Sequence, residues 1–116
     1  MNSILFILNE GPYGNERAYN ALRLAGALVS KEELHIRIFL MGDAVGCAHT
    51  GQKVPEGYYN LQVMLGKLAR NGEVGLCGTC LDARGMTDIE LAPGTKRSTL
   101  AELADWTVEA DKVLVF

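Results

Sequence analysis

The chain has 116 residues, of which 48% are hydrophobic and 22% are charged. That composition supplies enough apolar surface for a packed core and excludes an intrinsically disordered chain, and the length is that of one domain. The formal net charge is −3 and both signs are scattered along the chain, which argues against the clustered basic face of a nucleic-acid-binding protein.

Neither a membrane span nor a secretory signal is expected. No apolar run approaches the length of about 18 residues that suggests a membrane span. The first apolar segment, Ile4 to Leu8, is too short for a signal-peptide core and has no positive flank. The chain has three cysteines, an odd number that makes a poor disulfide framework. We therefore expect a cytoplasmic protein whose cysteines are catalytic, metal-binding or buried thiols.

The chain begins with a strand, a loop and a helix. Residues 3–8 (SILFIL) form a continuous apolar run, which is typical of a strand buried on both faces of a parallel sheet. Residues 9–14 (NEGPYG) read as a loop. Asn15 is suited to cap a helix that begins at Glu16, in which small and apolar residues share one face as far as Val29.

A second strand–loop–helix unit follows and leads into a third strand. Residues 34–41 predict the strand, and residues 42–57 a long glycine-rich loop. Residues 58–71 carry leucines and a methionine at helical spacing, and Gly72 is a natural stop. Residues 73–77 (EVGLC) are a short third strand.

The last third of the chain starts with at most two helical turns, residues 78–84. Residues 86–97 read as irregular. Thr99 and Glu102 have the spacing of a capping box at the start of another helix. Residues 112–116 (KVLVF) form a last strand.

This alternation predicts an α/β fold: a doubly wound, mostly parallel sheet of about five strands with helices on both faces, as in flavodoxin-like proteins. Right-handed crossovers then bring together the loops that begin at Asn9, Gly42 and Gly78, at the sheet edge where open sheets bind ligands. We expect residues 1–116 to form a single domain.

Cys77 is the strongest candidate for a reactive group. It ends a predicted strand and opens the segment Cys77-Gly78-Thr79-Cys80 at a helix start. Free backbone amides and the helix dipole favour a thiolate there, and Arg84 adds a positive charge four residues after Cys80. The alternative is that Cys77 is a buried strand residue that packs as a small hydrophobe.

Three chemistries fit these cysteines. Cys77 can carry a sulfane sulfur as a persulfide, or it can form a reversible disulfide with Cys80. Cys47, His49, Cys77 and Cys80 can instead form a structural zinc site, because both pairs are expected at one sheet edge. His49 is also a candidate base for a thiol, although a solvated loop histidine is the simpler interpretation.

The remaining candidates are weaker. Asn9, Glu10 and Tyr13 can line a pocket around Cys77, although the glycine-rich segment that contains them reads first as a turn. Tyr59 and Trp106 are predicted to lie on helices and to pack in the core or at a subunit interface.

The order and spacing of several segments resemble the DsrE-like sulfur-relay family, most closely its DsrE/TusD branch. The segments that carry the resemblance are EGPYGNERAYNALRLAGAL (residues 10–28), IFLMGDAV (residues 38–45), CGTCLDARG (residues 77–85) and ADKVLVF (residues 110–116). The resemblance implies one DsrE-like domain over residues 1–116, assembled as homotrimers or homohexamers, with a persulfide on Cys77.

The resemblance further implies sulfur donor and acceptor proteins as partners and no cofactor. Cys80, and Cys47 with His49, depart from the expected pattern and leave room for a disulfide or a metal site. We therefore expect a sulfur carrier or sulfurtransferase with Cys77 as acceptor and Cys80 as an assisting or resolving thiol. The alternatives are a binding or assembly module with structural or zinc-binding cysteines, and a thiol–disulfide oxidoreductase.

Overall fold

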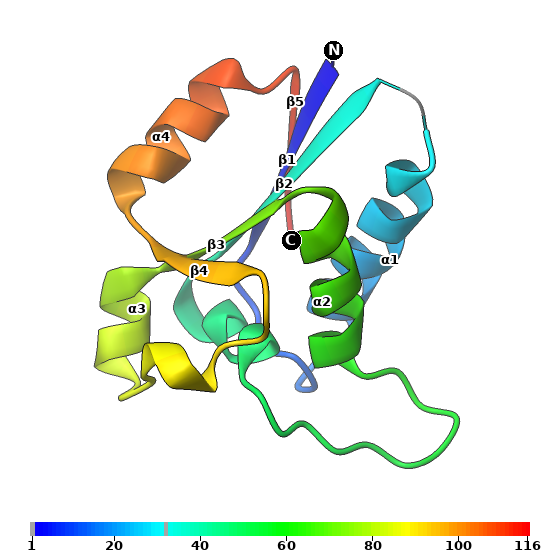
Figure 1. The fold of residues 1–116 in the computed structure, drawn as a ribbon, viewed down its shortest axis with the longest axis vertical. Coiled ribbons are helices and arrows are strands. Elements are labelled where there is room, and N and C mark those ends of the chain that lie inside the picture. Colours follow the sequence, from blue (N-terminus) through cyan, green and yellow to red (C-terminus); the bar gives the residue numbers. More distant parts are fainter. Residues whose placement is uncertain (1, 32) are drawn as a thin grey trace.

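A single five-stranded parallel sheet organises the molecule (Figure 1). The computed structural model describes residues 2–31 and 33–116. The strand order is β4-β3-β2-β1-β5. The strands are β1 (Asn2–Leu8), β2 (Leu34–Leu40), β3 (Glu73–Cys77), β4 (Thr95–Ser98) and β5 (Lys112–Val115).

Helices cover both faces of the sheet, which confirms the predicted doubly wound α/β fold. They are α1 (Arg17–Val29), α2 (Leu61–Asn71), α3 (Gly78–Ala83) and α4 (Leu100–Glu109), with the 3-10 helices η1 (Gly42–Ala48) and η2 (Asp88–Glu90). Figure 1 shows α1 and α2 on one side of the sheet and α4 on the other. The chain runs outward from β1 to β4 and then returns to the far side of β1, so α4 crosses the opposite face.

The apolar run of β1 is buried on both faces because strand side chains alternate. Ile4, Phe6 and Leu8 belong to the larger core cluster, together with side chains of α1 and α2. Leu5 belongs to a smaller cluster on the other face. Because both faces of β1 are packed against apolar side chains, a polar residue in its middle would be buried on either face. This is the reason for the unbroken apolar sequence.

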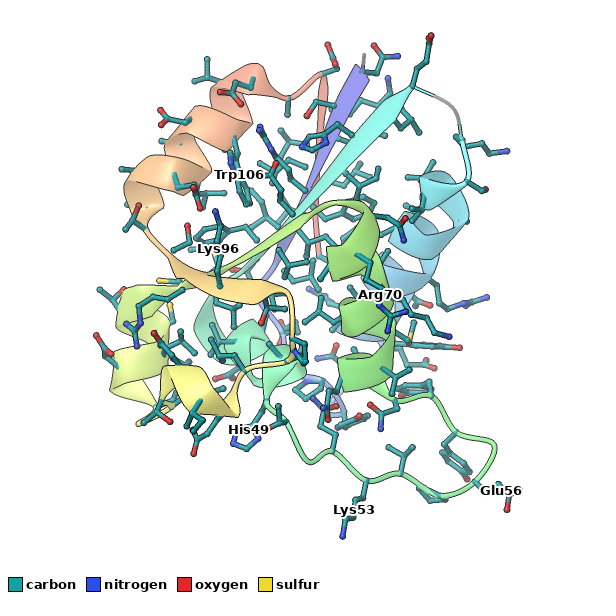
Figure 2. The ribbon with its side chains drawn as sticks, in the orientation of Figure 1. His49, Lys53, Glu56, Arg70, Lys96 and Trp106 are labelled. Atoms are coloured by element: carbon teal, nitrogen blue, oxygen red, sulfur yellow. The ribbon has the colours of Figure 1, made fainter. Side chains whose placement is uncertain are left out.

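The smaller core cluster lies under α4 and includes Cys77. Leu103 and Trp106 of α4 pack there against Leu5 and Phe39. Figure 2 shows Trp106 between α4 and the sheet, and its ring meets that of Phe39 edge to face, with centroids 6.1 Å apart. The expectation that Trp106 packs in the core is therefore confirmed.

Two elements differ from the sequence-based expectation. The segment that begins at Gly42 is not loop throughout, since η1 occupies residues 42–48. Residues 95–98 are a strand, although they read as irregular, because β4 is an edge strand with the largely polar sequence TKRS. A strand with one neighbour and exposed side chains carries no apolar signal.

Two helix starts, those of α1 and α2, differ from the predicted ones, by one and three residues. Helix α1 begins at Arg17, and the side chain of Asn15 accepts a hydrogen bond from the Arg17 amide. Helix α2 begins at Leu61 and is capped by Asn60, so Tyr59 lies before the helix and not on it. Thr99 caps α4 by accepting a hydrogen bond from the Glu102 amide, whereas the Glu102 carboxylate accepts from the Ser98 hydroxyl, so the expected capping box is half formed.

None of the helices in residues 2–31 and 33–116 has the length and apolar character that crossing a membrane would need.

Replacing Phe39 with alanine tests the smaller core. The side chain is fully buried against Trp106, so Phe39→Ala is expected to lower the free energy of unfolding by about 3–5 kcal/mol, and Phe39→Leu by about 1 kcal/mol. Urea unfolding followed by the fluorescence of Trp106, the single tryptophan, measures both. Val63→Ala, at an exposed position of α2, is the control and should change stability by less than about 0.5 kcal/mol. A loss for Phe39→Ala no larger than that of the control would contradict the packing.

Candidate functional site

The ends of β2 and β3 bring two segments of the chain together. Leu40 pairs with Leu76 in the parallel ladder, so Met41 and Cys77 follow it side by side. One step further, the backbone amide of Gly42 donates a hydrogen bond to the Sγ of Cys80 at 3.2 Å. Gly42 adopts a φ of 56°, a left-handed conformation that other residues rarely take. The expectation that the loops after β2 and β3 meet at one sheet edge is confirmed.

Cys77 is the last residue of β3 and the N-cap of α3. Its Sγ lies 3.1 Å from the hydroxyl oxygen of Thr79. Burial disfavours a charged sulfur, but hydrogen bonds from the Cys80 thiol, the Thr79 hydroxyl and the backbone amides of both residues outweigh it. The pKa of Cys77 is therefore lowered below its ordinary value, which increases the thiolate fraction at neutral pH.

Cys80 has the opposite electrostatic character. Burial and the neighbouring Cys77 sulfur raise the pKa of Cys80, against the opposing effects of the Gly42 amide and the positive charge of Arg84. Arg84 donates to the backbone carbonyl of Cys80 at 3.1 Å and pairs with Asp43 at 2.8 Å. The pKa values of the two thiols are thus shifted in opposite directions, so Cys77 is the one that loses its proton first.

A cavity of about 580 Å³ opens onto Cys77. It lies between α3 and the start of α4, where β3 and β4 end. The described residues that line it are Cys77, Gly78, Thr79, Asp82, Arg97, Ser98, Thr99 and Leu100. Cys77 is 9% exposed and combines a lowered pKa with access from this cavity. That combination is typical of a nucleophilic cysteine and not of an inert core thiol.

Arg97 holds the first turn of α3 in place. Its guanidinium donates to the carbonyl of Gly78 at 3.0 Å and also contacts the carboxylates of Asp82 at 3.1 Å and Asp88 at 3.0 Å. A Cβ on Gly78 would lie 3.0 Å from Nη1 of Arg97 and 3.1 Å from the carbonyl oxygen of Ser98, so a larger residue would have to displace these neighbours slightly. Arg97 therefore positions the segment that carries Cys77.

The other two residues of the predicted zinc site have different environments. Cys47 is fully buried, its Sγ lies 3.9 Å from the carbonyl oxygen of Glu10, and burial raises its pKa to about 12. The Nδ1 of His49 lies 2.6 Å from the carbonyl oxygen of Thr50, and Figure 2 shows the ring at the molecular surface. In the described part of the chain no group of three or more His, Cys, Asp or Glu side chains is arranged to hold a metal ion, so these four residues do not form a zinc site.

Asn9, Glu10 and Tyr13 do not line the cavity at Cys77. The Tyr13 hydroxyl contacts Gln52 and accepts a hydrogen bond from the Leu61 amide at 3.2 Å. The ring of Tyr13 also stacks with Tyr59, at a centroid distance of 6.1 Å. These contacts connect the turn after β1 to the long segment before α2, whose Lys53 and Glu56 point outward in Figure 2. The turn interpretation is the one that the structure supports.

Thr79, Arg97 and Gly42 are site residues that the sequence did not single out. Thr79 stood inside the CGTC segment, and Arg97 in the single adjacent basic pair of the chain, Lys96-Arg97. Neither signal is specific without the register that places β4 beside β3, with Ser98 opposite Cys77.

Comparison with known families gives a match: the sequence model of the DsrE/DsrF-like family matches residues 2–116. The chain belongs to the DsrE/DsrF-like family. The resemblance found in the sequence is thereby confirmed over nearly the whole chain.

Individual proteins and solved structures are also similar to this DsrE/DsrF-like chain. Protein YchN of Escherichia coli (strain K12) is 50% identical over 118 residues, with all of both chains covered. An uncharacterized protein of Methanopyrus kandleri is 38% identical over 114 residues, covering 97% of this chain and 93% of that protein. The crystal structure of the E. coli ychN protein superposes with a TM-score of 0.92 at 49% identity over the whole of both chains. A protein of unknown function from Methanobacterium thermoautotrophicum shares the fold alone, with a TM-score of 0.77 at 14% identity over the whole of both chains.

The hydroxyl of Thr79 is a testable contributor to the reactivity of Cys77. Alkylation rate rises with pH as the thiolate forms, so a lowered pKa moves the curve toward acid. Thr79→Val removes a hydrogen-bond donor and should move the Cys77 midpoint upward by up to about one pH unit. Iodoacetamide labelling from about pH 5 to about pH 10, on both sides of the ordinary thiol pKa, measures this midpoint when the labelled peptides are resolved by mass spectrometry.

Thr79→Ser keeps the hydroxyl and is the matched control, which should leave the midpoint in place. Cys47 should stay unlabelled in the folded protein, because it is fully buried and its pKa is raised to about 12. An unchanged midpoint in Thr79→Val would mean that the hydroxyl does not stabilise the thiolate.

Proposed function

We propose that this DsrE/DsrF-like protein is a sulfur carrier or sulfurtransferase that holds sulfane sulfur as a persulfide on Cys77. The observation that carries the proposal is a single one: a cysteine with a lowered pKa ends a strand and faces a cavity. Family membership supports a sulfur-relay-related role. The partners would be sulfur donor and acceptor proteins, and the reaction needs no cofactor.

The chemistry consists of two displacements. In the first, the Cys77 thiolate attacks the outer sulfur of a sulfane donor, a new S–S bond forms, and the remainder of the donor leaves with the electron pair of the broken bond. In the second, an acceptor thiolate attacks the outer sulfur of the persulfide and Cys77 leaves as a thiolate. A low thiol pKa assists both steps, since it raises the thiolate fraction of the attacker and improves the leaving group.

The hydrogen bonds around Cys77 suit both states of the sulfur. The Thr79 hydroxyl and the amides of Thr79 and Cys80 stabilise the thiolate before loading and when it leaves again. The cavity gives the outer sulfur room beside Thr79 and Asp82. Three free thiols also fit a reducing compartment, and we propose the cytoplasm as the place where the protein works.

A second candidate function is a binding or assembly module whose cysteines do not react.

Exposed apolar side chains on the α4 face of the sheet favour self-association under either function. Val113 and Val115 pair with Leu5 and Ile7 of β1 and share their face of the sheet, yet they are 39% and 66% exposed. We propose that a second copy of the chain covers this face in a homotrimer or homohexamer, because uncovered apolar patches mark association surfaces.

Persulfide uptake is tested most cleanly in Cys80→Ser, in which Cys77 is the one cysteine left in the motif. After reduction, incubation with sodium tetrasulfide and capping with iodoacetamide, the peptide with Cys77 should gain the mass of one sulfur in addition to the cap. The double variant Cys77→Ser/Cys80→Ser should gain none, and Cys47→Ala in the Cys80→Ser background should gain as much as its parent. No gain in Cys80→Ser, with its thiols confirmed reduced, would favour the binding-module alternative.

Assembly is tested by placing a charge on the uncovered face. Light scattering coupled to size exclusion should give a trimer or hexamer for the wild type and a smaller species for Val115→Glu, because a buried carboxylate opposes association. Val63→Glu, at a position of α2 that is 52% exposed, is the matched control and should assemble normally. A wild-type protein that is monomeric at all concentrations would contradict the proposal.

A further inference from the structure

Cys77 and Cys80 lie one helical turn apart at the start of α3. Cys77 is the N-cap of α3, and Cys80 is the third residue of that helix. Cys80 also packs against the smaller core cluster, to which Cys77 belongs. Both thiols are free in this structure. Cys80 is therefore the thiol of this chain that is placed beside Cys77.

The two sulfurs differ in which molecules can reach them. Cys77 faces the cavity between α3 and α4, whereas Cys80 is not among the described residues that line it. Cys80 packs partly buried against both core clusters, and its Sγ is held by the Gly42 amide at 3.2 Å. A donor or acceptor therefore meets Cys77 from the cavity, whereas Cys80 is a neighbour of Cys77 within the protein.

We propose that Cys80 is a resolving thiol: it attacks the Sγ of the Cys77 persulfide and releases the outer sulfur as sulfide. This inference rests on the proposed persulfide on Cys77. The bond from Cys77 Sγ to the outer sulfur breaks, and a Cys77–Cys80 disulfide forms. The outer sulfur leaves as hydrosulfide with the electron pair of the broken bond and takes up the proton that Cys80 loses. The Cys80 sulfur is oxidised and the outer sulfur is reduced, so the step needs no further oxidant or reductant.

The geometry of displacement at sulfur fits this arrangement. The attacking and leaving sulfurs lie on opposite sides of the sulfur that is attacked. The step therefore requires the outer sulfur to extend away from Cys80, and the cavity at Cys77 gives that sulfur room and gives hydrosulfide a way out. The same persulfide is open to an acceptor from the cavity side, which attacks the outer sulfur instead. The protein thus has two outcomes for one loaded sulfur: transfer to an acceptor, or release as sulfide with closure of the disulfide.

The electrostatics set when each outcome dominates. Burial and the adjacent Cys77 sulfur raise the pKa of Cys80, so Cys80 is mostly protonated at mildly acidic pH and more often a thiolate at alkaline pH. Because the thiolate is the attacking form, release should be slow at acidic pH and faster as pH rises. The pKa of Cys77 is shifted in the opposite direction, so lowering the pH should slow loading of Cys77 less than it slows attack by Cys80.

The experiment separates loading from release. Wild type and Cys80→Ser are reduced, loaded with sodium tetrasulfide at mildly acidic pH, desalted and shifted to alkaline pH. Intact mass and sulfide trapped with monobromobimane are followed over time. The wild type should lose its added sulfur, end lighter than the reduced protein by two hydrogens, and release one equivalent of sulfide. Cys80→Ser should retain the added sulfur longer by about tenfold or more, because it has no intramolecular thiol at this site.

Two controls and three outcomes decide the question. Cys47→Ala keeps both motif cysteines and should behave as the wild type, and wild type carried through without tetrasulfide should form no disulfide. If the wild type retains its sulfur as long as Cys80→Ser, or forms the disulfide without one equivalent of sulfide, resolution by Cys80 is overturned while the proposed carrier function stands. If Cys80→Ser takes up no sulfur at all, the carrier function itself fails, and the resolving role fails with it.

Discussion

The hydrogen bond from the Gly42 amide to the Cys80 sulfur is the contact on which the geometry of the site depends. It joins the loop after β2 to the helix after β3, and it is possible because these strands are parallel neighbours in register, with Leu40 opposite Leu76. Cys77 lines the cavity and Cys80 does not, so the two thiols have different surroundings. Arg97, on β4, also holds the start of α3 by donating a hydrogen bond to the carbonyl of Gly78.

The position of the site within the fold is unusual for a doubly wound sheet. Ligands of such sheets commonly bind where the strand order reverses, which here lies between β1 and β5. In this chain Asn9 at that point donates from its amide to the carbonyl of Phe116 at 3.0 Å. The candidate site at Cys77 lies instead two strands away, at the end of β3, where the cavity is bounded by α3 and the start of α4. The incompletely covered sheet face under α4 is also the face to which Cys77 belongs.

The three cysteines have three different environments. Burial gives Cys47 a pKa of about 12. Hydrogen bonds that converge on Cys77 outweigh its burial and lower its pKa, whereas burial and the neighbouring Cys77 sulfur raise the pKa of Cys80. In the proposed sulfur carrier, this asymmetry would leave Cys77 to react with external partners and Cys80 to react with Cys77.

The sequence by itself determined the α/β class, the order of the main elements and the segment that carries the site. Apolar runs such as residues 3–8 and the helix start after Cys77 are local patterns, and local patterns record secondary structure and burial. Only the tertiary structure identified β4, a polar edge strand, and showed that Thr79, Arg97 and Gly42 surround the two sulfurs while Cys47 and His49 do not join them. Those facts depend on strand register and on the crossing of α4, which bring together residues far apart in the chain, and no local pattern encodes such distances.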